Sequence, residues 1–132
     1  MELRNTENLV ITIGTDILKN ERIKKNIKNI SFIKRILSDK EMQTFKRIKN
    51  INRKLEFIAG RFCAKESITK AVKYKLNFNQ ISINHDSTVE LDQVISEKIE
   101  KILGTTNFDI QLSISHEREY TISTCLLILK KT

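Results

Sequence analysis

A single carboxylate lies inside an otherwise apolar helical pattern near the middle of the chain. In RKLEFIAGRFCAKESITKAVKY, residues 53–74, Glu66 falls on the same stripe as Phe62 when the run is projected at about 100° per residue. Because an unpaired buried charge is too costly, Glu66 must be neutralised, paired with a cation or bound to a metal. Two interpretations of Glu66 stay open: an ion pair with Lys70 or Arg61, or a ligand for a hard cation such as Mg²⁺.

A cation site of that kind needs a second acid, and Asp16 is the best candidate. The β-branched run LVITIG predicts a buried strand that ends at Gly14, followed by a turn that carries Asp16. A strand end can present a carboxylate to a cleft, but an N-cap for the following helix explains Asp16 equally well. His116, in SISHE, is a turn residue, a phosphate contact or a proton-transfer group.

Positive charge is in excess, which implies an anionic partner. The chain has 24 Lys and Arg against 16 Asp and Glu, a formal net charge of +8. Lys54, Arg61 and Lys65 form a narrow basic strip between the apolar faces of the run 53–74, where they can offset phosphate charge. A basic nucleic-acid-binding domain would also satisfy the net charge. The 2 Tyr and 6 Phe fall mostly on apolar faces, however, so no base-stacking platform is indicated.

The flanking segments mix helices and strands without regular alternation, which is typical of an α+β fold. The run 17–37 predicts one helix or two short pieces, and Ser38 with Glu41 forms a capping box that begins another helix. QISIN and TVEL predict short strands. Asp92 and Gly104 are predicted to cap a helix at its start and end. FDIQLSIS and YTISTCLLILK predict two antiparallel strands joined at residues 116–119.

At 132 residues the chain is expected to form one domain, residues 1–132, with a core of its own. No stretch approaches the roughly 20 apolar residues that span a bilayer, and MELRNTENL lacks a signal-peptide core, so a cytoplasmic location without membrane attachment is expected. Cys63 and Cys125 lie in apolar surroundings and are expected to be reduced and buried.

Four segments, in chain order, resemble the successive signatures of the bacterial holo-acyl-carrier-protein synthases, the small phosphopantetheinyl transferases. They are IGTDIL with Arg22 close behind, FIKRILSDKE, FIAGRFCAKESITKA and SISHEREYTIS. The resemblance implies the 4'-phosphopantetheinyl transferase fold, an α+β fold with an antiparallel sheet packed around a long central helix. It also implies transfer of the 4'-phosphopantetheine arm of coenzyme A to a serine of apo acyl carrier protein. Adenosine 3',5'-bisphosphate is released, and the product supports fatty acid biosynthesis.

The resemblance assigns the reacting groups. Asp16 and Glu66 match the two acids that hold Mg²⁺ at the coenzyme A pyrophosphate, and Lys70 matches a lysine that lies toward the phosphopantetheine and pyrophosphate. Either Glu66 or a metal-bound water that it assists accepts the proton of the attacking serine, and the choice stays open.

The same resemblance places the remaining coenzyme A contacts and the carrier surface. Arg53, Arg61 and Lys65 match positions near the nucleotide phosphates, and His116 matches the histidine of the coenzyme A site. Residues that match the basic surface for the acidic recognition helix of the carrier are Arg22, Lys24, Lys25 and Lys28. For the lysines, a solvated helix face is the competing interpretation.

The family also implies a homotrimer with active sites at the subunit interfaces, in which the apolar last strand has a role. Two features depart from the family pattern. The segment after the central helix, KAVKYKLNFNQ, has no glycine where many members carry a glycine loop, and Lys19 and Glu117 replace residues common in the family. Candidates to replace the loop contacts are Tyr74, Lys75 and Asn77. A degenerate member that keeps the fold without the activity is therefore a third possibility.

Overall fold

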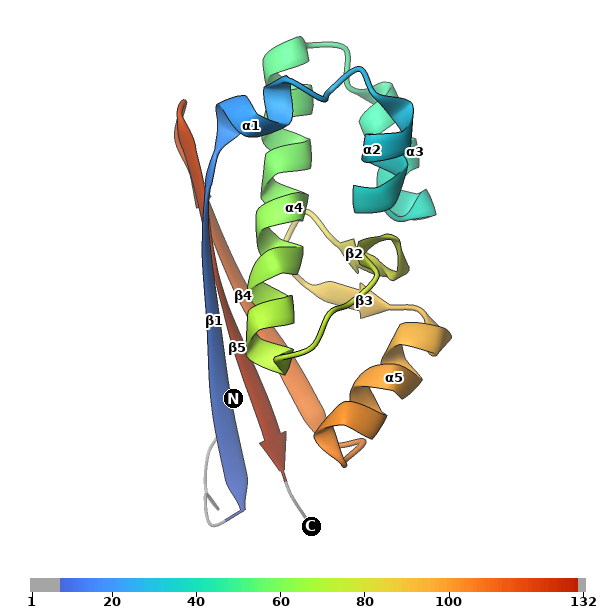
Figure 1. Ribbon diagram of the computed structural model, residues 1–132, viewed down its shortest axis with the longest axis vertical. Helices are drawn as coiled ribbons and strands as arrows, with labels where there is room; N and C mark the ends of the chain where they lie inside the picture. The colour runs from blue at the N-terminus through green and yellow to red at the C-terminus, as the bar shows by residue number, and fades with distance from the viewer. Residues whose placement is uncertain (1–7, 131–132) are drawn as a thin grey trace.

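The computed structural model describes residues 8–130 and has an α+β architecture (Figure 1). Strands β1 (Leu9–Lys19), β5 (Tyr120–Lys130) and β4 (Phe108–His116) form an antiparallel sheet in the order β1-β5-β4. A separate hairpin joins β2 (Ile81–Ile83) to β3 (Val89–Leu91). The sheet lies along one side of the long helix α4 (Ile51–Val72), and the shorter helices and the hairpin lie on the other sides of α4.

Strand β1 is longer than the sequence predicted. It does not end at Gly14 but continues through Asp16 to Lys19, because every residue from Leu9 to Lys19 pairs with β5. Asp16 therefore lies within a strand, opposite Ser123, and not in a turn or at a helix N-cap. The expectation that this strand is buried is correct for one face only, since Ile13 on the other face is 61% exposed.

The capping predictions are confirmed. Helix α3 (Asp39–Arg47) begins with a capping box between Ser38 and Glu41. Helix α5 (Gln93–Leu103) is capped by Asp92, whose side chain accepts from the amide of Ile95, and it ends at Gly104 with φ of 72°.

The run 17–37 forms two short helices, α1 (Asn20–Lys24) and α2 (Ile30–Ile36), because its first residues remain in β1 and residues 25–29 turn. The link between α4 and β2 contains a 3-10 helix, η1 (Phe78–Gln80).

Helix α4 is buried on two sides, as the double apolar pattern predicted. One side, represented by Ala64 and Ile68, packs into a core with the sheet, α5 and the β2–β3 hairpin. The other, represented by Ile58 and Cys63, packs into a second core with α1, α2 and α3. Within the described residues no helix is long and apolar enough to cross a membrane.

Candidate active site

Asp16 and Glu66 come together where β1 crosses α4. Alternate residues of β1 face α4, as shown by Thr12, whose hydroxyl donates to the carbonyl of Ala71 at 2.8 Å. Asp16 lies on this face, and its side chain is 16% exposed. Partial burial of Glu66 raises its pKa, and the charge of Asp16 raises it further. The two acids that the sequence singled out therefore lie close enough to interact.

Gly14 allows β1 to approach α4 this closely. A Cβ at Gly14 would lie 2.0 Å from the carbonyl oxygen of Ser67 and 2.7 Å from the amide nitrogen of Ala71, both backbone atoms. Any side chain at this position would therefore push the strand away from the helix. The glycine predicted to end the strand instead sets its distance from α4. It lies two residues before Asp16 along β1, and Ser67 follows Glu66 directly.

The thiol of Cys63 lies behind the same contact. Its Sγ donates to the carbonyl of Asp16 at 3.3 Å, and burial together with the Asp16 charge raises the pKa of the thiol to about 12. Both cysteines are free and buried, as predicted. Cys63 is therefore a packing residue that supports the backbone of Asp16, and its thiol stays protonated at neutral pH.

Lys70 pairs with Asp16 and not with Glu66. Its ammonium donates to Asp16 Oδ1 at 3.1 Å and to the carbonyl of Thr15 at 2.8 Å. Among residues 8–130 no salt bridge to Glu66 is found, so the local ion pair with Lys70 or Arg61 that the sequence left open does not form. Glu66 thus keeps its acceptor capacity beside a second carboxylate and one cation.

This donor set fits a hard divalent cation. Mg²⁺ is commonly held by one or two carboxylates and leaves its other positions to water and phosphate. Asp16 and Glu66 supply two, and a cation between them would relieve the repulsion that raises the Glu66 pKa. Within the described part of the chain there is no group of three or more His, Cys, Asp or Glu that could form an all-protein cage. The ammonium of Lys70 already balances one of the two acids.

A cavity of about 690 Å³ opens beside Glu66. Glu66 and Thr69 of α4 form one wall, and Arg35 of α2 contributes a positive charge. The glycine-free segment after α4 forms much of the rest of its lining, which comprises Lys75, Leu76, Asn77, Phe78, Asn79 and Gln80. Lys75 and Asn77, two of the predicted replacement contacts, therefore line a cavity beside Glu66. Tyr74 instead lies against Lys98 of α5, whose ammonium is 5.2 Å from the ring centroid.

The segment begins with an unusual backbone conformation. Lys73 caps α4 with φ of 65° and ψ of 33°, the left-handed conformation that glycine adopts without steric cost. Lys73 therefore takes a backbone conformation that glycine usually supplies at the end of a helix.

A second cavity, of about 280 Å³, brings together three of the predicted coenzyme A contacts. Arg53 and Arg61 come from α4, and His116 comes from the end of β4. The guanidinium of Arg61 lies 3.9 Å from the ring centroid of Phe57. The turn between β2 and β3 adds His85, which the sequence analysis missed because an exposed turn residue carries no periodic pattern.

Lys65 does not lie at either cavity, so its predicted place near the nucleotide phosphates is not supported. Its side chain is 0% exposed, and its ammonium donates to Glu41 Oε1 at 2.5 Å, to the carbonyl of Ile36 at 2.7 Å and to that of Phe78 at 2.9 Å. Burial lowers the pKa of Lys65 to about 8, against the opposing effect of Glu41. With its three donors used, Lys65 joins α4 to α2, α3 and η1.

The carboxylate of Glu41 is also fully engaged. Besides Lys65, it accepts from the amides of Ser38 at 3.0 Å and Ile83 at 2.8 Å. Arg61 Nε lies 3.8 Å from Glu41 Oε2, too far for a hydrogen bond, and this buried nitrogen has no partner in the described residues. Arg61 therefore lies between the buried cluster and the second cavity.

The basic residues predicted to receive the carrier are exposed. Arg22 lies on α1, whereas Lys25 and Lys28 lie beyond its last residue, in the turn before α2, and not on a single first helix as expected.

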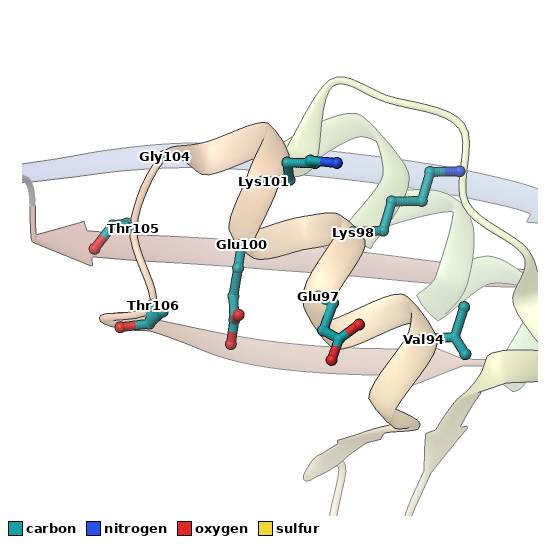
Figure 2. Close-up of a pocket in the computed structure, with 8 residues that line it drawn as sticks. All are labelled: Val94, Glu97, Lys98, Glu100, Lys101, Gly104, Thr105 and Thr106. Atoms are coloured by element: carbon teal, nitrogen blue, oxygen red, sulfur yellow. The ribbon is translucent and has the colours of Figure 1, made fainter.

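A third hollow lies along α5 and the loop that follows it (Figure 2). None of the predicted site residues lines it. Figure 2 shows Glu97 and Glu100 directed to one side of α5, and Lys98 and Lys101 to the other, so its charged groups do not converge. We assign the functional site to the two cavities along α4.

Comparisons with known proteins show the family to which the chain belongs. The model of the 4'-phosphopantetheinyl transferase superfamily matches residues 12–125. The chain is 36% identical over 126 residues to the holo-[acyl-carrier-protein] synthase of Pelagibacter ubique, covering 89% of this chain and 96% of that protein. It is 38% identical over 124 residues to the enzyme of the same name from Finegoldia magna, covering 91% and 97%.

A crystal structure of a holo-(acyl-carrier-protein) synthase from Bacillus anthracis, in complex with CoA (3',5'-ADP), is similar to this fold. Its TM-score is 0.71 at 30% sequence identity, and the match covers 92% of this chain and 99% of that one. The chain therefore belongs to the 4'-phosphopantetheinyl transferase superfamily, which confirms the resemblance found in the sequence. It is a transferase of the holo-[acyl-carrier-protein] synthase type.

Proposed function

We propose that this protein transfers the 4'-phosphopantetheine arm of coenzyme A to a serine hydroxyl of apo acyl carrier protein, releasing adenosine 3',5'-bisphosphate and supporting fatty acid biosynthesis. The observation that carries the proposal is the proximity of the Asp16 and Glu66 carboxylates beside the Glu66 cavity, in a chain of this family. The relatives bear the name of this activity, and the Bacillus anthracis structure was solved with CoA (3',5'-ADP).

In this proposal the second cavity receives the nucleotide phosphates. Arg53, Arg61 and His116 converge there from α4 and β4, and guanidinium groups suit phosphate because they can donate two parallel hydrogen bonds. The guanidinium of Arg61 is held beside this cavity by its Nη2, which donates to the carbonyl of Ile83 at 3.1 Å. Lys65 is left out of this set because its donors are used internally.

Asp16 and Glu66 would hold Mg²⁺ in the proposed reaction. When bound, the ion would neutralise charge on the pyrophosphate and on the leaving group. Glu66 makes no ion pair within the described residues, so its carboxylate is available both to a cation and to the proton of the serine hydroxyl. Lys70, held at Asp16, is placed to offset the charge of the same phosphates.

The carrier would approach over α1 and the turn after it. Arg22, Lys25 and Lys28 are exposed there, and positive charge favours association with an acidic helix. Arg35 extends this charge to the rim of the Glu66 cavity, where the carrier serine must arrive.

We also propose a homotrimer, supported by the outer face of the sheet. Apolar side chains of β1 and β5 are exposed on the face opposite α4; they are Ile11, Ile13, Ile17, Ile122 and Leu126. Contiguous exposed apolar residues of this kind mark an interaction surface, and copies of the chain would cover it.

The modification of a carrier tests the proposal. Incubated with coenzyme A and Mg²⁺, the protein should add the mass of one phosphopantetheine to apo acyl carrier protein, as measured by intact-mass spectrometry. EDTA should stop the reaction and added Mg²⁺ should restore it.

Variants test the site itself. Glu66→Gln and Asp16→Asn should each lower the rate on the order of 10²- to 10³-fold, because each removes a negative ligand at the reacting phosphate. Glu97→Gln on the outer side of α5 is the matched control and should keep the wild-type rate. If both site variants kept the wild-type rate and metal dependence, the assignment of the acid pair would be wrong.

One observation favours a second candidate, a family member without activity. Lys73 occupies a left-handed position at the end of α4, where a glycine loop approaches the cofactor in many members. Calorimetric titration with coenzyme A in the presence of Mg²⁺ separates the two candidates. Binding heat supports the transferase, and no heat supports the inactive member.

A further inference from the structure

Asn20 is a buried polar residue that none of the roles above uses. It is the first residue of α1 and is only 3% exposed. An amide side chain at this depth is costly unless its donors and its acceptor are all satisfied. Its partners therefore indicate what the residue does.

The hydrogen-bond partners of the Asn20 side chain and amide lie in the β4–β5 turn, residues 117–119, and at the start of β5. Its Nδ2 donates to the carbonyls of Glu117 at 3.2 Å and Arg118 at 3.3 Å. Its Oδ1 accepts from the hydroxyl of Thr121 at 2.7 Å, and its backbone amide donates to the carbonyl of Glu119 at 2.8 Å. One residue thus binds nearly every position of the turn.

The turn carries His116 at its start. His116 is the last residue of β4, its register partner on β5 is Thr121, and its side chain lines the second cavity. Thr121 is 0% exposed, so its bond to Asn20 lies in the interior. The position of His116 therefore depends on a turn that Asn20 holds against α1.

We propose that Asn20 is a positioning residue that holds the His116 turn in place for coenzyme A and ties it to α1, which carries Arg22 of the carrier surface. This inference rests on the proposed function. It predicts that loss of the Asn20 amide weakens coenzyme A binding through His116 and leaves the chemical step at the acid pair unchanged.

The test compares kinetic constants of the full chain. Asn20→Ala should raise the KM for coenzyme A roughly tenfold while kcat stays within about twofold, because a buried network loses its anchor outside the reacting groups. His116→Ala should raise the same KM, and adding Asn20→Ala to it should have little further effect. Asn107→Ala, an exposed asparagine before β4, is the matched control and should leave both constants unchanged.

A milder pair of variants covers the case in which Asn20→Ala does not fold. Thr121→Val removes only the hydroxyl bond to Asn20 and should raise the KM in the same direction, whereas Thr121→Ser keeps the hydroxyl and should behave as wild type. An unchanged KM in both Asn20→Ala and Thr121→Val, or a full effect of Asn20→Ala in the His116→Ala background, would overturn the proposal.

NMR gives a readout that does not depend on activity. The chain has 2 histidines, so the ring signals of His116 and His85 are readily assigned. Asn20→Ala should shift or broaden the His116 signals and leave those of His85, which belongs to another turn, in place. If the wild-type chain modified no carrier, the proposed function would fail while these signals still tested the role of Asn20. An unchanged His116 spectrum would refute the positioning role.

Discussion

Two lysines on α4 each pair with a carboxylate, but their surroundings differ. Lys65 is 0% exposed and its partner Glu41 is 2% exposed, whereas Lys70 is 52% exposed and Asp16 is 16% exposed. In the described part of the chain, Lys65 and Glu41, the Lys65 cluster, have no free donor or acceptor for a ligand. The Lys65 ammonium donates to backbone carbonyls of α2 and η1, and the Glu41 carboxylate accepts from backbone amides at the start of α3 and in β2. The Lys70 cluster contains Glu66, for which no ion pair is found within residues 8–130.

Lys65 and Glu41 form a closed, structural ion pair, whereas Lys70 and Asp16 form a partly open one at the candidate site. A buried pair persists only when nearly all its donors and acceptors are satisfied, and then nothing remains to bind a ligand. An excess of carboxylate over cation at a partly open position leaves capacity for a metal and for phosphate. Both clusters include residues of α4. Lys65 and Glu66 are adjacent in the sequence but belong to different clusters.

Removing the buried ammonium of Lys65 should have the largest effect on the free energy of unfolding. Lys65→Met leaves Glu41 buried and unpaired, so we expect a loss of about 3–5 kcal/mol in the free energy of unfolding. Chemical denaturation followed by circular dichroism measures it. Replacing both partners, Glu41→Leu with Lys65→Met, should recover part of the loss, because the buried carboxylate that lost its hydrogen-bonded cation is then absent as well. A Lys65→Met variant of wild-type stability would show that the pair is not a structural unit.

Adding a methyl group at Gly14, where β1 contacts α4, should have an intermediate effect on the free energy of unfolding. Gly14→Ala places a Cβ against backbone atoms of α4, and we expect a loss of about 1–3 kcal/mol in stability from overpacking. Because Asp16 moves with β1, carrier modification should fall as well. Gly60→Ala is the control for stability, since a Cβ there meets only Ile114 Cγ2 at 4.0 Å. A Gly14→Ala variant with unchanged stability and activity would contradict the role of the close approach.

Removing the exposed ammonium should have the smallest effect on stability. Lys70→Met should change the free energy of unfolding by about 0–1 kcal/mol, because a pair that reaches solvent gains little from its charges. The same thermal or chemical unfolding measurement as for Lys65→Met makes the two lysines directly comparable. A destabilisation of Lys70→Met as large as that of Lys65→Met would remove the distinction between the clusters.

Local sequence patterns predicted the helix starts and ends well, because capping depends on residues close together in the chain. The capping box at Ser38, the cap at Asp92 and the left-handed Gly104 each depend on residues a few positions apart. The predicted end of β1 at Gly14 was wrong, because contacts with segments distant in the chain decide where this strand ends. Gly14 was interpreted as a turn residue, although pairing with β5 and contact with α4 keep it in the strand.

Most residues that the sequence proposed for the site lie at or beside the two cavities along α4, whereas Lys65 is buried away from both. A helical projection put Lys65 beside Arg61 on a basic strip, but it could not tell that α2, α3 and η1 cover that strip. Asn20 was overlooked for a similar reason, since its partner Thr121 lies 101 residues away in the chain. Neither the Lys65 contacts nor the Asn20–Thr121 hydrogen bond produces a periodic pattern in the sequence.

By itself the sequence determined the family and the helix caps and singled out the two acids as candidates, because these depend on residue types at short, fixed spacings. Only the tertiary structure decided which charges are free to act. Lys65 was committed to Glu41, and Lys70 to Asp16, by the packing of segments distant in the chain. Burial sets the energetic cost of an unpaired charge, and burial is a property of the folded chain that no local spacing encodes.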